Sequence, residues 1–405
     1  MRVTTTDLSR PRAATSSDAA GIASRWVGVG ASSHPSAAVA AVEAITAALQ
    51  DRTPALVLLF VSPSFDLAAV ASAAESSVPR DAPVIGCTTS GEIADGAAGS
   101  GRIAAVALGG PGFAVQVSAG ALAEGGREAG RAAARALAGL DRPYRVLLLL
   151  HDGLAGERSQ VVRGAYSVAG STVPLVGGCA GDELAMVATH QLLDGRVLTG
   201  SVIGAAIGSD APIGVGVGHG WTRIGEPMVV THSDGHRIFT LDDEPALDHY
   251  LRRVGAGPEV LADDELWRHT TLRRPLGLSR PGGEEIRAVL GTDHGDRSLS
   301  CSDVPQGTVI WAMAGDPDSV NKGTRAACDE ALAGLHGAPA LGVIAFDCAA
   351  RRAILGESGL VGEVAVMHER LGEVPVGGFY TYGEIARTRG ARGVHNATLV
   401  LLALA

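Results

Sequence analysis

PVIGCTTSGEIA (residues 83–94) occurs a second time, with few changes, as PVGGFYTYGEIA (residues 375–386). Aligned without a gap, the two stretches share eight of their twelve residues, including the Thr, Gly, Glu, Ile and Ala that close each stretch. A weaker copy, VPLVGGCAGDELA (residues 173–185), lies between them and keeps Pro, Gly, Glu and Ala in step, with Glu183 as its acidic residue. The chain therefore builds one structural unit three times.

The sequence around each copy indicates how that unit folds. A short apolar run precedes each copy, as in ALVLLFV (55–61), RVLLLLHDG (145–153) and PALGVIAF (339–346), and a helix-like stretch lies between. Runs of this length are typical of buried strands, and strand, helix, strand is a right-handed crossover between parallel strands. Another apolar run follows each Gly-Glu turn. The predicted class is mixed α/β, in two sequence-related halves, each with a mixed sheet of strand-helix-strand units followed by a Gly-Glu turn and a further strand.

The length of the chain suggests more than one domain. A chain of 405 residues exceeds what one hydrophobic core usually organises. Residues 1–25 contain Thr, Ser, Ala and Arg without an apolar core, and we expect a disordered tail there. The halves are expected to be an N-terminal domain over residues 26–240 and a C-terminal domain over residues 241–405.

The composition argues against several classes of partner. With 33 basic and 43 acidic residues, the chain has no strong positive field to hold nucleic acid. No apolar run reaches the roughly 20 residues of a membrane helix, so no membrane partner is expected. The five cysteines form no closely spaced pair that would indicate a disulfide scaffold or a zinc site. A cytoplasmic protein fits this pattern best.

The Gly-Glu turns are the candidate ligand sites. Each turn offers backbone N–H groups with little side-chain cover and a carboxylate, and such a place at a sheet end can hold a small zwitterion. The expected ligand-binding residues are Thr88, Thr89, Gly91, Glu92, Cys348, Arg351, Tyr382, Gly383, Glu384, Asn396 and Thr398. The alternative is architectural, because a Glu after Gly can also fold back and satisfy the amides of its own loop.

An enzyme is the less favoured class. The chain has no phosphate-binding loop, no His-Glu-x-x-His pattern and no Gly-x-Ser-x-Gly elbow. Cys348 lies beside Arg351 and Arg352, which would lower its pKa if they came near, although a Cys at a strand end is usually a small core residue. Cys87 and Cys179 would need a neighbouring base to act as nucleophiles. We therefore expect a binding protein without a catalytic residue.

Several motifs together resemble the FIST family, with its N-terminal and C-terminal FIST domains. They are VGVGASSHPSAAVAAVEAITAALQ (27–50), VIGCTTSGEIA (84–94), LVGGCAGDEL (175–184), GGFYTYGEIA (377–386) and HNATLVLLAL (395–404). The resemblance runs from about Trp26 to Leu404. It implies a sensory module of bacterial signal transduction that binds a small ligand, such as an amino acid or a similar polar metabolite.

The resemblance also implies a second hypothesis and a partner. One subgroup of the family is said to bind haem and sense nitric oxide. Here His219, in GVGHGW, matches the family motif, and it competes with His190 and His395 as an iron ligand. One histidine does not make a haem site, so the expected cofactor is none. No kinase or cyclic-dinucleotide enzyme is recognisable in the chain, so we expect such an output to reside in a separate partner.

Overall fold

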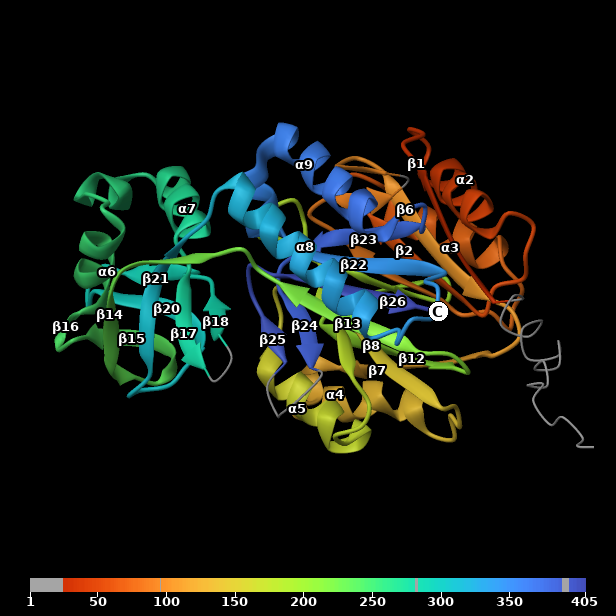
Figure 1. Cartoon of the computed structure of the whole chain (residues 1–405), viewed down its shortest axis with the longest axis horizontal. Helices are drawn as coiled ribbons and strands as arrows, with labels where there is room; N and C mark the ends of the chain where they lie inside the picture. The colour runs from red at the N-terminus through yellow and green to blue at the C-terminus, as the bar shows by residue number, and fades with distance from the viewer. Residues whose placement is uncertain (1–24, 95, 281–282, 388–392) are drawn as a thin grey trace, which may run out of the picture.

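The computed structural model describes residues 25–94, 96–280, 283–387 and 393–405. Within these ranges, four sheets and eight α-helices confirm the predicted mixed α/β class. Three mixed sheets make up the core, and the fourth belongs to an inserted domain that lies at one side of it (Figure 1). The expected tail over residues 1–25 lies outside the described residues except for Arg25, which is buried and donates a hydrogen bond to Ser209 (2.8 Å).

The core consists of three units with one order of elements: outer strand, helix, central strand, helix, third strand, hairpin and last strand. The first unit contains β1 (Trp26–Ser32), α2 (Ala37–Leu49), β2 (Leu56–Val61), α3 (Leu67–Ser76), β3 (Val84–Thr88), β4 (Glu92–Ala94), β5 (Ala97–Gly99) and β6 (Ile103–Gly109). The second contains β7 (Phe113–Ala121), η1 (Leu122–Glu124), α4 (Gly126–Ala134), η2 (Arg135–Leu137), β8 (Tyr144–His151), α5 (Arg158–Ala169), β9 (Leu175–Cys179), β10 (Gln191–Leu193), β11 (Arg196–Leu198) and β12 (Ser201–Ser209). The third contains β13 (Ile213–Gly218), α8 (Pro317–Ala333), β22 (Gly342–Cys348), α9 (Ala349–Leu371), β23 (Val376–Thr381), β24 (Glu384–Arg387), β25 (Val394–His395) and β26 (Leu399–Leu404).

The three units exchange hairpins in a cycle. Each unit arranges its own strands in the same order, β1-β6-β2-β3, β7-β12-β8-β9 and β13-β26-β22-β23. Each hairpin, however, extends the sheet of another unit: β4 pairs with β23, β10 pairs with β3, and β24 pairs with β9. No unit completes its sheet alone. The predicted N-terminal half therefore holds the first two units and β13 of the third, and the C-terminal half holds the remaining elements of the third unit.

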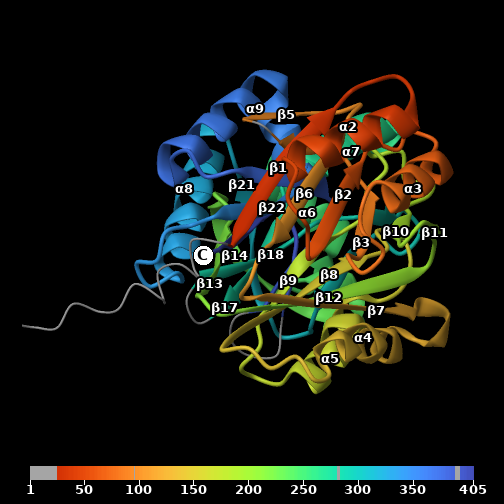
Figure 2. The same ribbon diagram turned by 90° about the vertical axis from the view of Figure 1, so that its right-hand side faces the viewer.

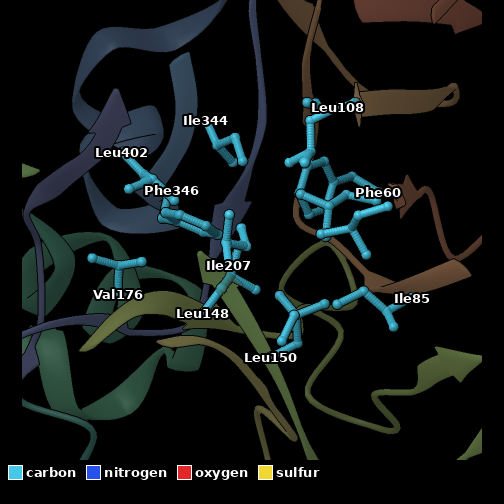
Figure 3. Close-up of a cluster of buried hydrophobic side chains, with 14 of the residues drawn as sticks. Phe60, Ile85, Leu108, Leu148, Leu150, Val176, Ile207, Ile344, Phe346 and Leu402 are labelled. Atoms are coloured by element: carbon cyan, nitrogen blue, oxygen red, sulfur yellow. The ribbon is translucent and has the colours of Figure 1, made fainter. Parts of the chain in front are cut away.

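The inner faces of the three sheets share one core. Phe60 on β2, Leu148 on β8 and Phe346 on β22 belong to a single cluster of buried side chains (Figure 3). Phe60 stacks on Phe379 of the third unit, with ring centroids 4.7 Å apart. A pair of helices covers the outer face of each sheet, α2 with α3, α4 with α5 and α8 with α9 (Figure 2). Burial between the units, rather than within one, holds the core together.

The inserted domain lies between β13 and α8 and has a hydrophobic cluster of its own. It contains β14 (Thr222–Ser233), β15 (Gly235–Leu241), β16 (Glu244–Pro245), α6 (Ala246–Val254), η3 (Pro258–Ala262), α7 (Asp264–Arg273), β17 (Leu276–Arg280), β18 (Gly283–Arg287), β19 (Gly291–Asp293), β20 (Ser298–Val304) and β21 (Val309–Ala314). Two short segments, residues 219–221 and 315–316, join it to the core. The boundary expected between residues 240 and 241 lies near the end of β15, inside this domain.

Candidate functional site

The carboxylate of Glu384 lies inside the turn of the third unit. Its side chain is fully buried and accepts hydrogen bonds from the hydroxyl of Thr381 (2.6 Å) and from the backbone N–H and hydroxyl of Thr398 (3.0 and 2.9 Å). Burial raises the pKa of Glu384 to about 7 despite these bonds. The carboxylate ties the start of hairpin β24–β25 to the strand that follows it. This geometry favours the architectural alternative for Glu384.

Glu92 takes the same place in the first unit. It is fully buried, accepts a hydrogen bond from the hydroxyl of Thr89, and accepts another from the backbone N–H of Arg102 (3.3 Å). Burial raises the pKa of Glu92 to about 8. Gly91 in the same turn has a φ of 121°, which favours glycine, and its N–H donates to the Thr89 hydroxyl (3.3 Å). The polar groups of the first turn therefore also bond to neighbouring protein groups and not to an open space.

The second unit places Gln191, not Glu183, at the equivalent position. Gln191 is opposite Cys87 at the start of a hairpin, as Glu92 is opposite Phe379 in the first. The gap-free alignment was wrong here, because the turn of this copy is eight residues longer, from Glu183 to Gln191. Glu183 instead accepts a hydrogen bond from the hydroxyl of Ser62 (2.9 Å).

A cleft of about 430 Å³ opens between the core and the inserted domain. Its core wall lies at the carboxyl ends of the parallel strands β22 and β23, where α/β sheets commonly bind ligands. Of the predicted residues, Cys348, Tyr382 and Asn396 line it. Residues that were not expected from the sequence also line it, among them Arg158 and Thr381 on the core side, and Asp264, Trp267, Arg268, Leu272, Val289 and His294 on the inserted domain.

Asn396 and Arg158 are two polar residues of the core wall with hydrogen-bond donors near the cleft. Asn396 is 4% exposed as a residue, and its amide, which remains accessible at the cleft, forms no hydrogen bond with any residue that the structure describes. The Arg158 guanidinium donates to the carbonyls of Tyr382 (2.9 Å) and Gly153 (3.3 Å). A Cβ on Gly383 would lie 2.4 Å from Arg158 Nη1 and 3.3 Å from Asn396 Nδ2. The missing side chain of Gly383 lets both donors approach the turn.

Tyr382 connects the cleft to the long loop of the second unit. Its hydroxyl donates a hydrogen bond to the carboxylate of Asp182, which also accepts from the backbone N–H groups of Met186, Val187 and Ala188 (3.0, 2.7 and 3.0 Å). Burial raises the pKa of Asp182, but these hydrogen bonds outweigh it and the net pKa is lowered. The Asp182 carboxylate therefore fixes the loop through three backbone amides, and Tyr382 of the cleft hydrogen-bonds to that carboxylate.

Arg351 does not line the cleft. Its guanidinium is fully buried and donates to Asp347 (2.6 Å), to Glu363 (2.5 Å) and to the carbonyl of His219 (2.8 Å). Two carboxylates share this one cation, and burial raises the pKa of Asp347 well above its ordinary value. Arg351 thus joins β22, α9 and the segment that leads into the inserted domain, rather than meeting a ligand in the cleft.

Thr88 lies apart from the cleft as well. Its hydroxyl accepts a hydrogen bond from the backbone N–H of His190 (3.0 Å), and it lines a separate depression with Asp182 and Glu183. The predicted residues thus divide among two turns, one ion cluster, a separate depression and the cleft. Of these places, the cleft is the open volume that borders the second Gly-Glu turn.

The three histidines that the family resemblance offered as iron ligands lie outside this cleft, which His294 lines instead. Nδ1 of His219 accepts a hydrogen bond from the backbone N–H of Trp221 (2.9 Å), and burial lowers the pKa of His219. Nε2 of His395 lies 2.9 Å from the carbonyl oxygen of Ala386. None of His190, His219 and His395 lines the cleft. Among the described residues, no group of three or more His, Cys, Asp or Glu side chains is placed to hold a metal ion.

The cysteines have the character of core residues. Cys87, Cys179 and Cys348 are buried, and burial raises the pKa of each thiol, that of Cys179 to about 11. Arg351 pairs with Asp347 and Glu363 instead of activating Cys348. A thiol with a raised pKa is a poor nucleophile at neutral pH. The geometry gives no support to a cysteine-dependent enzyme.

Comparison with known families agrees with the repeated turns. The FIST N domain matches residues 55–244, and the FIST C domain matches residues 246–387. The chain belongs to the FIST family. FIST N covers most of the first two units and the start of the inserted domain, and FIST C covers the rest of that domain and much of the third unit. FIST domains are known as sensory domains, which favours a binding role over a catalytic one.

Relatives of this FIST protein occur in bacteria and archaea. An uncharacterized protein of Mycobacterium tuberculosis is 29% identical over 388 residues, covering 92% of this chain and 97% of the relative. One of Mycobacterium bovis is 29% identical over 230 residues, 55% of this chain and 58% of the relative. One of Methanocaldococcus jannaschii is 24% identical over 167 residues, 39% of this chain and 32% of the relative. In the described part of the FIST chain, no helix has the length and apolar character of a membrane span.

Proposed function

We propose that this FIST protein is a sensory protein that binds a small polar ligand, an amino acid or a similar metabolite, in the cleft between the core and the inserted domain. The observation that carries the proposal is the amide of Asn396, which borders the cleft, is accessible there and has no hydrogen-bond partner among the described residues. An amide that faces a cleft without a protein partner is free to bond whatever occupies the cleft, and most polar groups in such places are hydrogen-bonded. A ligand in the cleft would supply these bonds.

The charges around the cleft suit a zwitterion. Arg158 lies on the core wall, and Asp264 lies on the wall formed by the inserted domain. A carboxylate near Arg158 and an ammonium near Asp264 would each gain a charge-assisted hydrogen bond, worth about 1.5 to 3 kcal/mol. The cleft volume of about 430 Å³ falls within the range of small-molecule sites. In this proposal Asp264 takes the role that the sequence analysis gave to Glu92 and Glu384.

Binding between two bodies offers a way to report occupancy. A ligand that contacts both walls stabilises the arrangement in which the inserted domain and the core are close, and so shifts the population of such arrangements. The loop that Asp182 holds exposes Met186 (57%) and Val187 (81%), which suits contact with another protein. We place the output in a separate partner, such as a kinase or a cyclic-dinucleotide enzyme.

A thermal-shift screen of the twenty amino acids and common small metabolites tests the proposal. A ligand at one hundred times its dissociation constant adds about 2.7 kcal/mol of stability and raises the melting temperature measurably. Asn396→Ala should remove most of that shift. Gln160→Ala, on the surface of α5, is the matched amide control and should keep it. Equal stabilisation of the wild type and Asn396→Ala by every active compound would rule out the cleft as the site.

A further inference from the structure

We infer that the ligand of the cleft is a small carboxylate with an apolar body. This inference rests on the proposed binding function and adds the chemical class of the ligand. The carboxylate lies against the core wall, at Arg158 and Asn396. The apolar body lies against side chains of the inserted domain and of the long loop. Three features of the walls lead to this assignment.

The first feature is a cation without a counter-ion. Arg158 is half-buried at the start of α5, and no carboxylate of the described residues lies within ion-pair distance of it. Its two hydrogen bonds go to neutral carbonyls, those of Tyr382 and Gly153. A partly desolvated guanidinium with unused donors favours an anion, and its planar geometry matches a carboxylate.

The second feature is the convergence of Arg158 with Asn396. Both side chains approach the space that a Cβ of Gly383 would occupy, at 2.4 Å for Arg158 Nη1 and 3.3 Å for Asn396 Nδ2. The Asn396 amide is accessible at the cleft and forms no hydrogen bond within the described chain. Two donors from different units thus reach one side of the cleft. One planar anion can accept from both.

The third feature is the group of apolar side chains on the facing wall, which also carries Asp264, Arg268 and His294. Leu184 comes from the long loop, and the inserted domain adds Leu261, Trp267, Leu272 and Val289. Burying an apolar side chain against such a wall contributes free energy, whereas a polar group there would lose hydrogen bonds to water. The ligand therefore has a carboxylate at one end and an apolar body, and an ammonium group, where the ligand carries one, lies toward Asp264.

Isothermal titration of the full chain with four matched compounds tests the inference. Leucine carries both groups, 4-methylpentanoate lacks the ammonium, leucinamide lacks the carboxylate, and asparagine has nearly the shape of leucine with a polar end. We expect leucine and 4-methylpentanoate to bind, and leucinamide and asparagine to bind at least tenfold more weakly. If leucine binds more tightly than 4-methylpentanoate, the ligand is an amino acid. If the two bind with equal affinity, the ligand is a simple carboxylate. Both results support the inference.

Variants separate the two ends of the ligand. Arg158→Met should weaken leucine at least tenfold, and Arg158→Lys should restore part of that loss if charge is what matters. Trp267→Ala should weaken leucine but leave the discrimination against leucinamide intact. Circular dichroism and the unliganded melting temperature show whether each variant is folded. A folded Arg158→Met that binds leucine as the wild type does would overturn the assignment of the carboxylate.

Other results would overturn the inference while leaving the proposed function standing. Leucinamide as tight as leucine removes the carboxylate requirement, and asparagine as tight as leucine removes the apolar body. The same holds if none of the four compounds binds while another screened compound binds and loses its effect in Asn396→Ala. By contrast, if every compound that binds does so equally well to the wild type and to Asn396→Ala, the proposed function itself is refuted.

Discussion

The hydroxyl of Tyr382 donates a hydrogen bond to the carboxylate of Asp182, across a boundary between two units of the core. Tyr382 lines the cleft, and Asp182 holds three successive amides of an exposed loop. That loop contains non-glycine residues with positive φ at Glu183, Leu184 and Met186 (55°, 65° and 56°). Such backbone persists only where surrounding contacts impose it. The pair therefore links the wall of the cleft to a constrained surface segment.

Tyr382→Phe should loosen this loop. Without the hydroxyl, Asp182 loses one of its four hydrogen-bond donors, and we expect the free energy of unfolding to fall by about 1 to 2 kcal/mol. Hydrogen–deuterium exchange at the amides of residues 186–188 should become faster. Tyr144→Phe, at a residue that is 37% exposed and whose hydroxyl forms no hydrogen bond with Asp182, is the matched control. Unchanged exchange at these three amides would mean that the tyrosine does not restrain the loop.

Glu384→Gln should change how stability depends on pH. Burial raises the pKa of Glu384 from 4.5 to about 7, so the folded state holds this proton more tightly than the unfolded state does. The wild type accordingly loses stability as pH rises from about 4.5 to about 7, and a glutamine, which cannot ionise, does not.

Urea unfolding at pH 4.5 and pH 8 measures this difference. Between these pH values, the stability of Glu384→Gln relative to the wild type should rise by roughly 2 to 4 kcal/mol. Glu124→Gln, at an exposed position, should show no such trend. A relative stability that is independent of pH would show that Glu384 ionises in the folded protein as it does in the unfolded chain.

The cysteines should react slowly while the protein is folded. All five are buried, and burial raises the pKa of every thiol (Cys87, Cys179, Cys301, Cys328 and Cys348). Because the thiolate is the reactive form, iodoacetamide at neutral pH should label none of them rapidly, and all five after unfolding in urea. Mass spectrometry counts the labels. One rapidly labelled cysteine would revive the enzyme hypothesis.

The repeated unit could be predicted from the sequence because local residue types determine it. Pro, Gly and Glu fall at fixed places between apolar runs, and these residue types set turns and strand ends whatever the rest of the fold. The exchange of hairpins could not be read. Nothing in EIA (92–94) indicates that it pairs with β23 of the third unit instead of with its own sheet, because strand pairing depends on distant partners.

The candidate site likewise contains residues that local sequence indicates and residues whose positions depend on distant parts of the chain. Cys348, Tyr382 and Asn396 could be predicted, because each lies near the edge where parallel strands end. Glu92 and Glu384 share the pattern, yet their side chains turn inward to Thr89 and Thr381, which no spacing rule reveals.

Two groups of the cleft were missed altogether. The sequence offered one signal for Arg158: like Arg352, it follows a buried strand. In the structure, the guanidinium of each donates a hydrogen bond to a carbonyl in the turn of another unit. Trp267 lies in a basic stretch that gave no reason to expect a cleft wall. Its place depends on how the inserted domain packs on the core, and that is a property of the whole chain.

Hydrogen–deuterium exchange with and without saturating leucine shows whether the cleft is the ligand site. We expect slower exchange at residues 396–398, at the start of α9 and along α7, with no change at Gly91 and Glu92 in the turn of the first unit. Protection confined to that first turn, with residues 396–398 and α7 unchanged, would contradict the assignment of the cleft.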